Sequence, residues 1–162
     1  MKSTLRLFVR YVVIAFVVVI GYRLADVFVD LPWEGCETEL CCSDCDQLDV
    51  VRVIDGDTFV SKDGRVRLYG MDTPELGERC ADEATRLMVD LAGDTVRVES
   101  GPRRKDPYER DLYYVYTYGG DSIDETLVRK GLALAWTRDG QHRDFLVDLE
   151  ATARERGVGC LW

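Results

Sequence analysis

Residues 50–75 read VVRVIDGDTFVSKDGRVRLYGMDTPE, and the hydrophobic pattern of this stretch decides the fold. Apolar and polar residues alternate over residues 49–54, and again over residues 58–61 after a turn at Asp55-Gly56. A second turn at Asp63-Gly64 leads into residues 65–69. Alternation bounded by Asp-Gly turns is typical of half-buried strands in hairpins. The stretch therefore predicts three consecutive short strands.

The remainder of the globular part predicts two more strands and three helices. Ser122 and Glu125 have the spacing of a capping box that opens a helix, and Gly93 and Gly157 follow helical patterns that they end. We expect strands over residues 96–99 and 112–117, and helices over residues 80–91, 123–130 and 145–156. Five short antiparallel strands with helices outside predict an α+β fold, a five-stranded barrel of the OB type.

A dense apolar run near the N-terminus predicts a membrane segment. Basic residues precede residues 11–22 at Lys2, Arg6 and Arg10, and Arg23 follows them. Counted from residue 5 to 29, the run approaches the ~20 residues that cross a bilayer. The strict apolar core is short and also suits a signal peptide, but no convincing cleavage site follows. We expect an uncleaved signal anchor or transmembrane helix over residues 1–31; a cleaved signal and a buried soluble helix are the alternatives.

Charges around this run predict its orientation. Bases lie on its N-terminal side and acids lie beyond it, which places the N-terminus in the cytoplasm. The expected localisation is therefore membrane-anchored with the globular domain extracellular, or secreted if the segment is cleaved.

Six cysteines agree with that location. Four lie in a Cys-rich linker over residues 32–47, and Cys80 and Cys160 lie in a domain over residues 48–162. Outside the cell cysteines tend to pair, although the connectivity cannot be read from sequence. If the linker cysteines pair among themselves, Cys80 and Cys160 are left to pair with each other. The alternative, a zinc site in the linker, lacks the two separated knuckles of a zinc ribbon.

The charge balance argues against a broadly basic surface, the usual feature of proteins that bind nucleic acid. The chain carries a net charge of −9, and residues 48–162 hold 23 acidic against 17 basic residues. Because phosphate contacts dominate affinity for nucleic acid, such a site must be a local basic patch; Arg103-Arg104-Lys105 is the only dense basic run. The excess of 19 Asp over 11 Glu and of 17 Arg over 4 Lys indicates a salt-loving archaeal source, or compositional drift.

Three separated motifs carry a family resemblance. They are VIDGDT at 53–58, RLYGMDTPE at 67–75 and DPYERDL at 106–112, and DETLVRKGLA follows at 124–133 with a terminal LW. Together they resemble the staphylococcal nuclease (thermonuclease) family over about 110 residues, from Val50 to the end. Each motif alone is weak, but all occur in the family's order at strand ends.

The first two motifs hold the residues for a metal site and a base. Asp57 and Asp72 are hard oxygen ligands that suit Ca²⁺, and Thr73 offers a backbone carbonyl. Glu75, three residues beyond Asp72, is placed to orient or deprotonate a metal-bound water. The resemblance assigns Asp57, Asp72 and Glu75 to the same roles.

Arginines complete the catalytic set. Arg67 and Arg110 are permanently charged forks that match phosphate oxygens, and in the family the corresponding arginines grip the scissile phosphate. Tyr108 and the run 103–105 are expected to contact the nucleic acid. Two positions depart from the family's pattern: Glu109 stands where glycine is common, and Pro107 where lysine is often found.

The resemblance implies a calcium-dependent endonuclease that hydrolyses DNA and RNA outside the cytoplasm, and we expect a monomer. The single histidine, His142, excludes mechanisms that need two imidazoles, and we expect it to be a solvated surface residue. The alternative is a non-catalytic OB-type module that binds nucleic acid or protein. Retention of Glu75 and both arginines favours the enzyme.

Overall fold

The computed structural model describes residues 35–162, and residues 36–162 form one compact unit. The predicted signal anchor over residues 1–31 lies outside the described residues. Within residues 35–162, no helix has the length and the apolar character that a membrane span needs.

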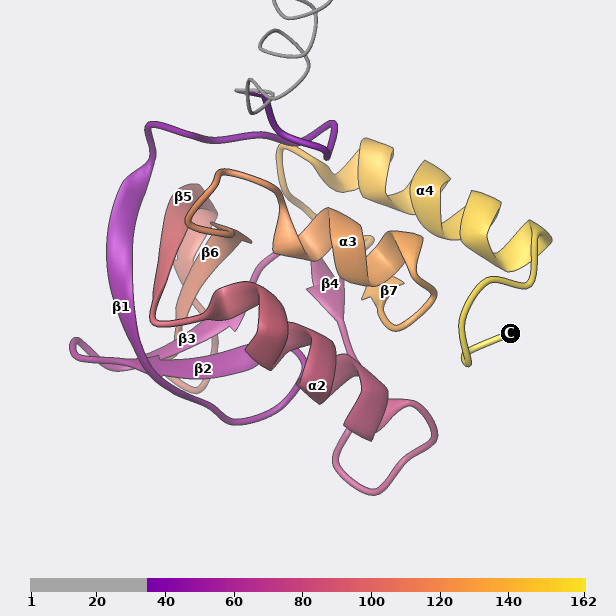
Figure 1. Ribbon diagram of the computed structural model, residues 1–162, viewed down its shortest axis with the longest axis horizontal. Coiled ribbons are helices and arrows are strands. Elements are labelled where there is room, and N and C mark those ends of the chain that lie inside the picture. Colours follow the sequence, from indigo (N-terminus) through magenta and orange to yellow (C-terminus); the bar gives the residue numbers. More distant parts are fainter. Residues whose placement is uncertain (1–34) are drawn as a thin grey trace, which may run out of the picture. The chain divides into compact units, whose positions relative to one another are not determined.

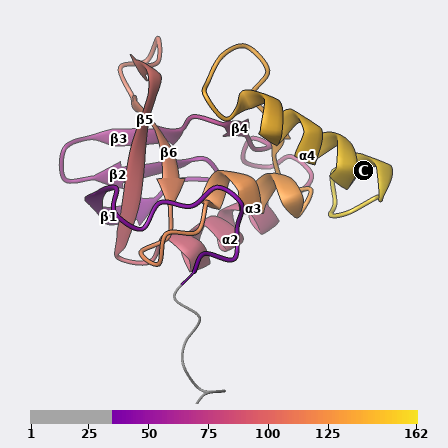
Figure 2. The same ribbon diagram turned by 90° about the horizontal axis from the view of Figure 1, so that it is seen from above.

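Five strands close into a barrel (Figures 1 and 2). They are β1 (Asp46–Val53), β2 (Thr58–Ser61), β3 (Arg65–Leu68), β5 (Thr95–Lys105) and β6 (Asp111–Tyr116), joined in the order β1-β2-β3-β6-β5. The predicted five-stranded barrel is confirmed, but β3 and β6 pair in parallel. The prediction of a wholly antiparallel barrel is wrong because an odd number of strands cannot alternate in direction all the way round a closed barrel.

Three helices accompany the barrel, as predicted: α2 (Ala81–Ala92), α3 (Ile123–Arg129) and α4 (Arg143–Glu155). Helix α3 lies between α2 and α4 in Figure 1 and contacts both. Two further strands, β4 (Met71–Asp72) and β7 (Leu134–Ala135), form a separate two-stranded sheet. Each is two residues long, so periodicity could not reveal them.

The core fills the barrel and the space beneath the helices. Phe59 and Val66 from the β2–β3 hairpin are buried together with Met88 of α2 and Leu127 of α3. Burying each such side chain stabilises the fold by about 1.5–3 kcal/mol. Strand β5 extends six residues beyond its predicted end at Glu99, because pairing with β6 resumes at Lys105 after an irregularity.

All six cysteines form disulfides. The pairs are Cys36–Cys41, Cys42–Cys45 and Cys80–Cys160. The expected pairing of Cys80 with Cys160 is confirmed. A four-thiolate zinc site in the linker is excluded, since every linker sulfur is bonded to another sulfur.

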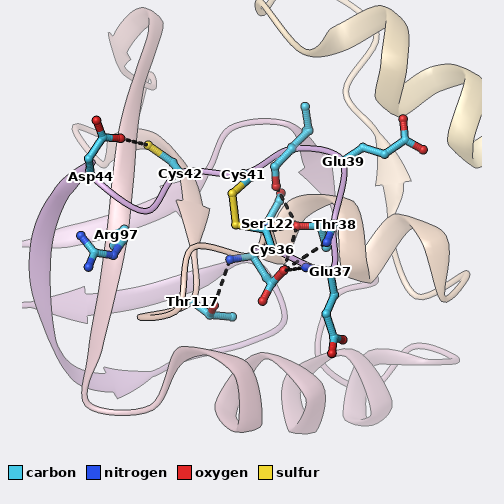
Figure 3. Close-up of a disulfide and its surroundings, with 12 residues drawn as sticks. Cys36, Glu37, Thr38, Glu39, Cys41, Cys42, Asp44, Arg97, Thr117 and Ser122 are labelled. Atoms are coloured by element: carbon cyan, nitrogen blue, oxygen red, sulfur yellow. Dashed lines mark hydrogen bonds between the residues drawn. A yellow bond between two sulfur atoms is a disulfide. The ribbon is translucent and has the colours of Figure 1, made fainter. Parts of the chain in front are cut away.

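Residues 36–45, which we call the strap, pack against the start of α3 (Figure 3). Ser122 Oγ accepts a hydrogen bond of 3.1 Å from the Glu125 amide, as the capping box predicts. The fully buried Glu125 carboxylate, however, accepts from the backbone amides of Glu39 at 3.2 Å and Leu40 at 2.7 Å. Thr38 Oγ1 takes over the amide of Ser122 at 2.8 Å. Of the two hydrogen bonds of a capping box, the one accepted by Ser122 Oγ is therefore present, and the one that Glu125 would accept from the Ser122 amide is replaced by a hydrogen bond to Thr38 of the strap.

Candidate active site

The β2–β3 hairpin and β4 bring three predicted residues together. Asp57, directly before β2, is 4% exposed. Arg67 on β3 donates hydrogen bonds to the carboxylates of Asp57 and Asp72, the latter on β4. Burial opposes the charged guanidinium, but these two carboxylates raise the pKa of Arg67. Two acids and an arginine are thus held around one point.

Asp57 is held on every side. Its Oδ2 accepts from the Thr73 amide at 3.0 Å and the Thr73 hydroxyl at 3.2 Å, and its Oδ1 accepts from Thr58 Oγ1 at 2.8 Å. The turn before it needs glycine, because a Cβ on Gly56 would lie 2.8 Å from both Ala84 Cβ and Thr73 Oγ1. The network orients Asp57 and Thr73 in advance of any ligand.

Arg110 is positioned by a loop carboxylate. Asp106 Oδ1 accepts from the amides of Tyr108 at 2.8 Å and Arg110 at 2.9 Å, and Oδ2 accepts from Arg110 Nε at 2.6 Å. Although burial acts in the opposite direction, these hydrogen bonds lower the pKa of Asp106. Glu109 is exposed with a φ of 62°. The carboxylate that pairs with Arg110 is therefore that of Asp106, which sequence reasoning did not single out.

One cleft gathers the candidate catalytic residues. Asp57, Arg67, Glu75 and Arg110 all line it. Glu75 is exposed and also borders an adjoining pocket lined by Asp72 and Thr73. The residues that were predicted from three separate motifs thus converge on one region.

The oxygen atoms of this region fit a hard cation. Asp57 and Asp72 both reach the Arg67 guanidinium, and Thr73 lies beside them. Among the described residues there is no group of three or more His, Cys, Asp or Glu that could hold a metal. A hard cation here would have the Asp57 and Asp72 carboxylates as side-chain ligands, with water and, as the sequence predicts, the Thr73 carbonyl; such oxygen donors suit calcium or magnesium rather than transition metals.

Comparison with known proteins decides the family. The family model described as Staphylococcal nuclease homologue matches residues 65–162. The chain belongs to the staphylococcal nuclease family. A thermonuclease of Staphylococcus hyicus is 39% identical over 100 residues, which cover 53% of this chain and 57% of that protein.

For two further relatives in the family, the match to this chain spans a larger share of the relative's length. An uncharacterized endonuclease of Escherichia coli O157:H7 is 35% identical over 117 residues, 67% of this chain and 74% of that protein. A micrococcal nuclease of Shigella flexneri is 34% identical over 129 residues, 70% of this chain and 72% of that protein. The predicted family is confirmed, and these names support a nuclease hydrolase.

The three residues of the basic run Arg103-Arg104-Lys105 have different surroundings in this staphylococcal nuclease homologue. Arg103 lines the cleft and pairs with Asp139. Lys105 pairs with Asp111 at 3.2 Å, and Arg104 is exposed. Of these three residues, Arg103 is the one that lines the cleft.

Two titratable residues, His142 and Asp55, have surroundings that the sequence analysis did not predict. The His142 side chain is 22% exposed, and its Nε2 lies 2.9 Å from Glu99 Oε2. The prediction of a solvated histidine is wrong because β5 brings a carboxylate to it. Asp55, which was not predicted as a site residue, lines the cleft, and burial together with the Asp57 carboxylate raises its pKa.

Proposed function

We propose that this protein is a calcium-dependent endonuclease that hydrolyses phosphodiester bonds in DNA and RNA. The convergence of Arg67, Arg110 and Glu75 on one cleft, beside the carboxylates of Asp57 and Asp72, carries the proposal. Such a cleft can bind an anionic phosphate although the chain carries a net charge of −9.

Phosphate binding falls to the two arginines. Arg110 is anchored through Nε on Asp106, and its Nη1 lies 3.4 Å from Thr58 Oγ1 inside the site. Arg67 donates one N–H group to each of two carboxylates, so its other N–H groups are the ones available to a phosphate oxygen. Charged donors that are oriented in advance stabilise developing charge without reorganisation.

Glu75 is the candidate general base. Its backbone amide is tied to Glu78 Oε2 at 3.0 Å, and the residue is exposed where the cleft and the adjoining pocket meet. A carboxylate at this place can take the proton of an attacking water. Calcium, held by Asp57, Asp72 and the Thr73 carbonyl, would supply positive charge to neutralise the phosphate.

Single substitutions test the proposal. Arg110→Ala and Glu75→Ala should each lower turnover on denatured DNA at least about a hundredfold, the scale of losing one preorganised contact. Arg52→Ala, at an exposed arginine of β1 outside the cleft lining, is the matched control and should retain activity. Circular dichroism checks the fold of each variant. A fully active Arg110→Ala would exclude the mechanism.

The metal has its own test. Chelation should abolish cleavage, and calcium should restore it better than metals that prefer nitrogen or sulfur ligands. Activity that survives complete chelation would contradict the proposed role of Asp57 and Asp72.

We also propose that the nuclease domain acts outside the cytoplasm. The three disulfides support this location, because structural disulfides persist in oxidising compartments. Membrane anchoring and a salt-rich habitat remain proposals that rest on the sequence. Fractionation of cells with an antibody against the domain would test the location, and recovery in the soluble cytoplasmic fraction would oppose it.

A further inference from the structure

The strap holds two disulfides that close separate loops. The bond between Cys36 and Cys41, drawn in Figure 3, encloses residues 37–40. The bond Cys42–Cys45 follows this loop and directly precedes β1. The two disulfides therefore divide the strap into the loop 37–40 and a segment that leads into the barrel.

All four backbone amides of the loop donate to carboxylates at the start of α3. The amides of residues 37 and 38 donate to Asp121 Oδ1, which lies directly before the N-cap of the helix. The amides of residues 39 and 40 donate to the two carboxylate oxygens of Glu125. The disulfide keeps these four donors together, because it joins the two residues that flank them.

The Glu125 carboxylate depends on this loop. The residue is fully buried, and Arg129 of the same helix supplies one further hydrogen bond at 2.5 Å. A buried carboxylate that loses its hydrogen-bond donors is strongly destabilised. Opening the loop would therefore shift the first turn of α3, because Glu125 lies in that turn.

The neighbouring residue of the same turn, Asp124, binds a different part of the fold. It is also fully buried. Its Oδ1 accepts from the Gly70 amide and its Oδ2 from the Val115 amide, both at 2.9 Å. Gly70 directly precedes β4, the two-residue strand that carries Asp72. The first turn of α3 is thus hydrogen-bonded to the strap through Glu125 and to the start of β4 through Asp124.

Strand β4 is fixed at few points. It pairs with β7 over Met71 and Asp72, and the Gly70 carbonyl accepts from the Trp136 amide at 2.8 Å. A shift of Gly70 would therefore move the backbone of Asp72. The carboxylate of Asp72 accepts a hydrogen bond from Arg67 and belongs to the candidate metal site.

We propose that Glu125 and Asp124 are positioning residues for the metal ligand Asp72, and that the loop closed by Cys36–Cys41 holds them in place. The inference rests on the proposed calcium site and assigns to it a support that lies outside the cleft. Losing a group that orients a metal ligand typically lowers metal affinity about 10–100-fold. Because the loop acts through a helical turn, opening it should have an effect near the lower end of this range.

Two disulfide variants test the inference. Cys36→Ser/Cys41→Ser opens the loop, and Cys42→Ser/Cys45→Ser is the matched control, because it removes another short disulfide from the same strap. In the chain-entropy account the two changes lower global stability by similar amounts. Calcium titration of the full chain, followed through amide signals in NMR spectra, measures both affinities. We expect the Kd to rise about tenfold in the first variant and to stay within about twofold of the original in the control.

Glu125→Gln tests the path from the loop to the helix. The glutamine keeps one oxygen as an acceptor, but its NH2 group cannot accept from a strap amide. Calcium affinity should therefore fall in this variant as well. Combining Glu125→Gln with the open loop should add little further loss, because both changes act on the same hydrogen bonds. Losses that multiply would contradict this path.

Hydrogen exchange gives a readout that needs no calcium. The Gly70 amide is protected by its bond to Asp124, and local opening sets its exchange rate. In the metal-free chain this amide should exchange faster in Cys36→Ser/Cys41→Ser than in the control, although both variants have lost one short disulfide.

Each outcome decides the inference. An equal change of Kd in the two disulfide variants, or no change in either, would overturn it, because the loop would then contribute to stability alone. Selectively faster exchange at Gly70 in a protein that binds no calcium would support the link from the strap to β4 and refute only the calcium proposal. Absence of both calcium binding and selective exchange would overturn both.

Discussion

Removing the disulfide between Cys80 and Cys160 should destabilise the domain more than removing either disulfide of the strap. It joins residues 80 apart in the sequence, whereas the strap pairs are 5 and 3 residues apart. In the chain-entropy account the long loop stabilises by about 4.5 kcal/mol, against roughly 2 kcal/mol for each short one. For a domain of this size, Tm should fall by roughly 15 °C.

The surroundings of the Cys80–Cys160 disulfide also predict a large loss of stability when it is removed. Cys80 occupies the N-cap of α2 with a φ of 75° and no side-chain cap, so the disulfide restrains a helix start that lacks local support. The tail that contains Cys160 packs closely on Gly131, where a Cβ would lie 1.9 Å from the Val158 carbonyl oxygen. Release of the tail would open this contact as well as enlarging the unfolded ensemble.

Denaturant and thermal unfolding of two double variants measure the effect. Cys80→Ser/Cys160→Ser removes the long loop, and Cys42→Ser/Cys45→Ser removes a short one; neither leaves a new free thiol. We expect the first to lose at least about 2 kcal/mol more than the second. Equal losses, or a larger loss in the strap variant, would refute the loop-entropy reasoning.

Two further predictions concern salt and pH. Because residues 48–162 hold 23 acidic and 17 basic residues, Tm should rise with KCl from about 0.1 to 3 M as self-repulsion is screened; a flat or falling Tm would remove the salt-loving interpretation. Burial raises the pKa of Asp124 to about 6, above its ordinary 3.8. The folded state therefore keeps a proton that the unfolded state has lost, and the unfolding free energy should fall as pH rises from about 4 to 6. Asp124→Asn should remove this part of the slope, and identical pH profiles for the two proteins would contradict the assignment.

Local patterns predicted the parts of the site that lie near one another in sequence. The turns at Asp55-Gly56 and Asp63-Gly64 form where expected, and β2 and β3 pair as a hairpin that carries Asp57 and Arg67. Ser122 caps α3 at the predicted place. These features depend on contacts within a few residues, which is why the alternation and the capping spacing reveal them.

The contacts of Trp136 and Arg103 at the cleft had no such signal. Trp136 follows a two-residue strand, and Arg103 reaches Asp139 across 36 positions of sequence. The sequence analysis predicted Arg103 as a nucleic-acid contact from its charge alone, and it did not identify Asp139, the acid that pairs with it. A tryptophan is as often a core residue as a ligand contact, so only its place in the cleft distinguishes the two.

The sequence by itself determined the family, the barrel strands, the three helices and the set of carboxylates and arginines, because these follow from short-range periodicity and motifs. Tertiary structure alone decided the parallel β3–β6 pair and the burial of Glu125 under the strap. Each depends on which groups meet across the closed barrel or the docked strap. A buried carboxylate takes whichever donors the fold brings to it, and no local pattern names donors that lie more than eighty residues away.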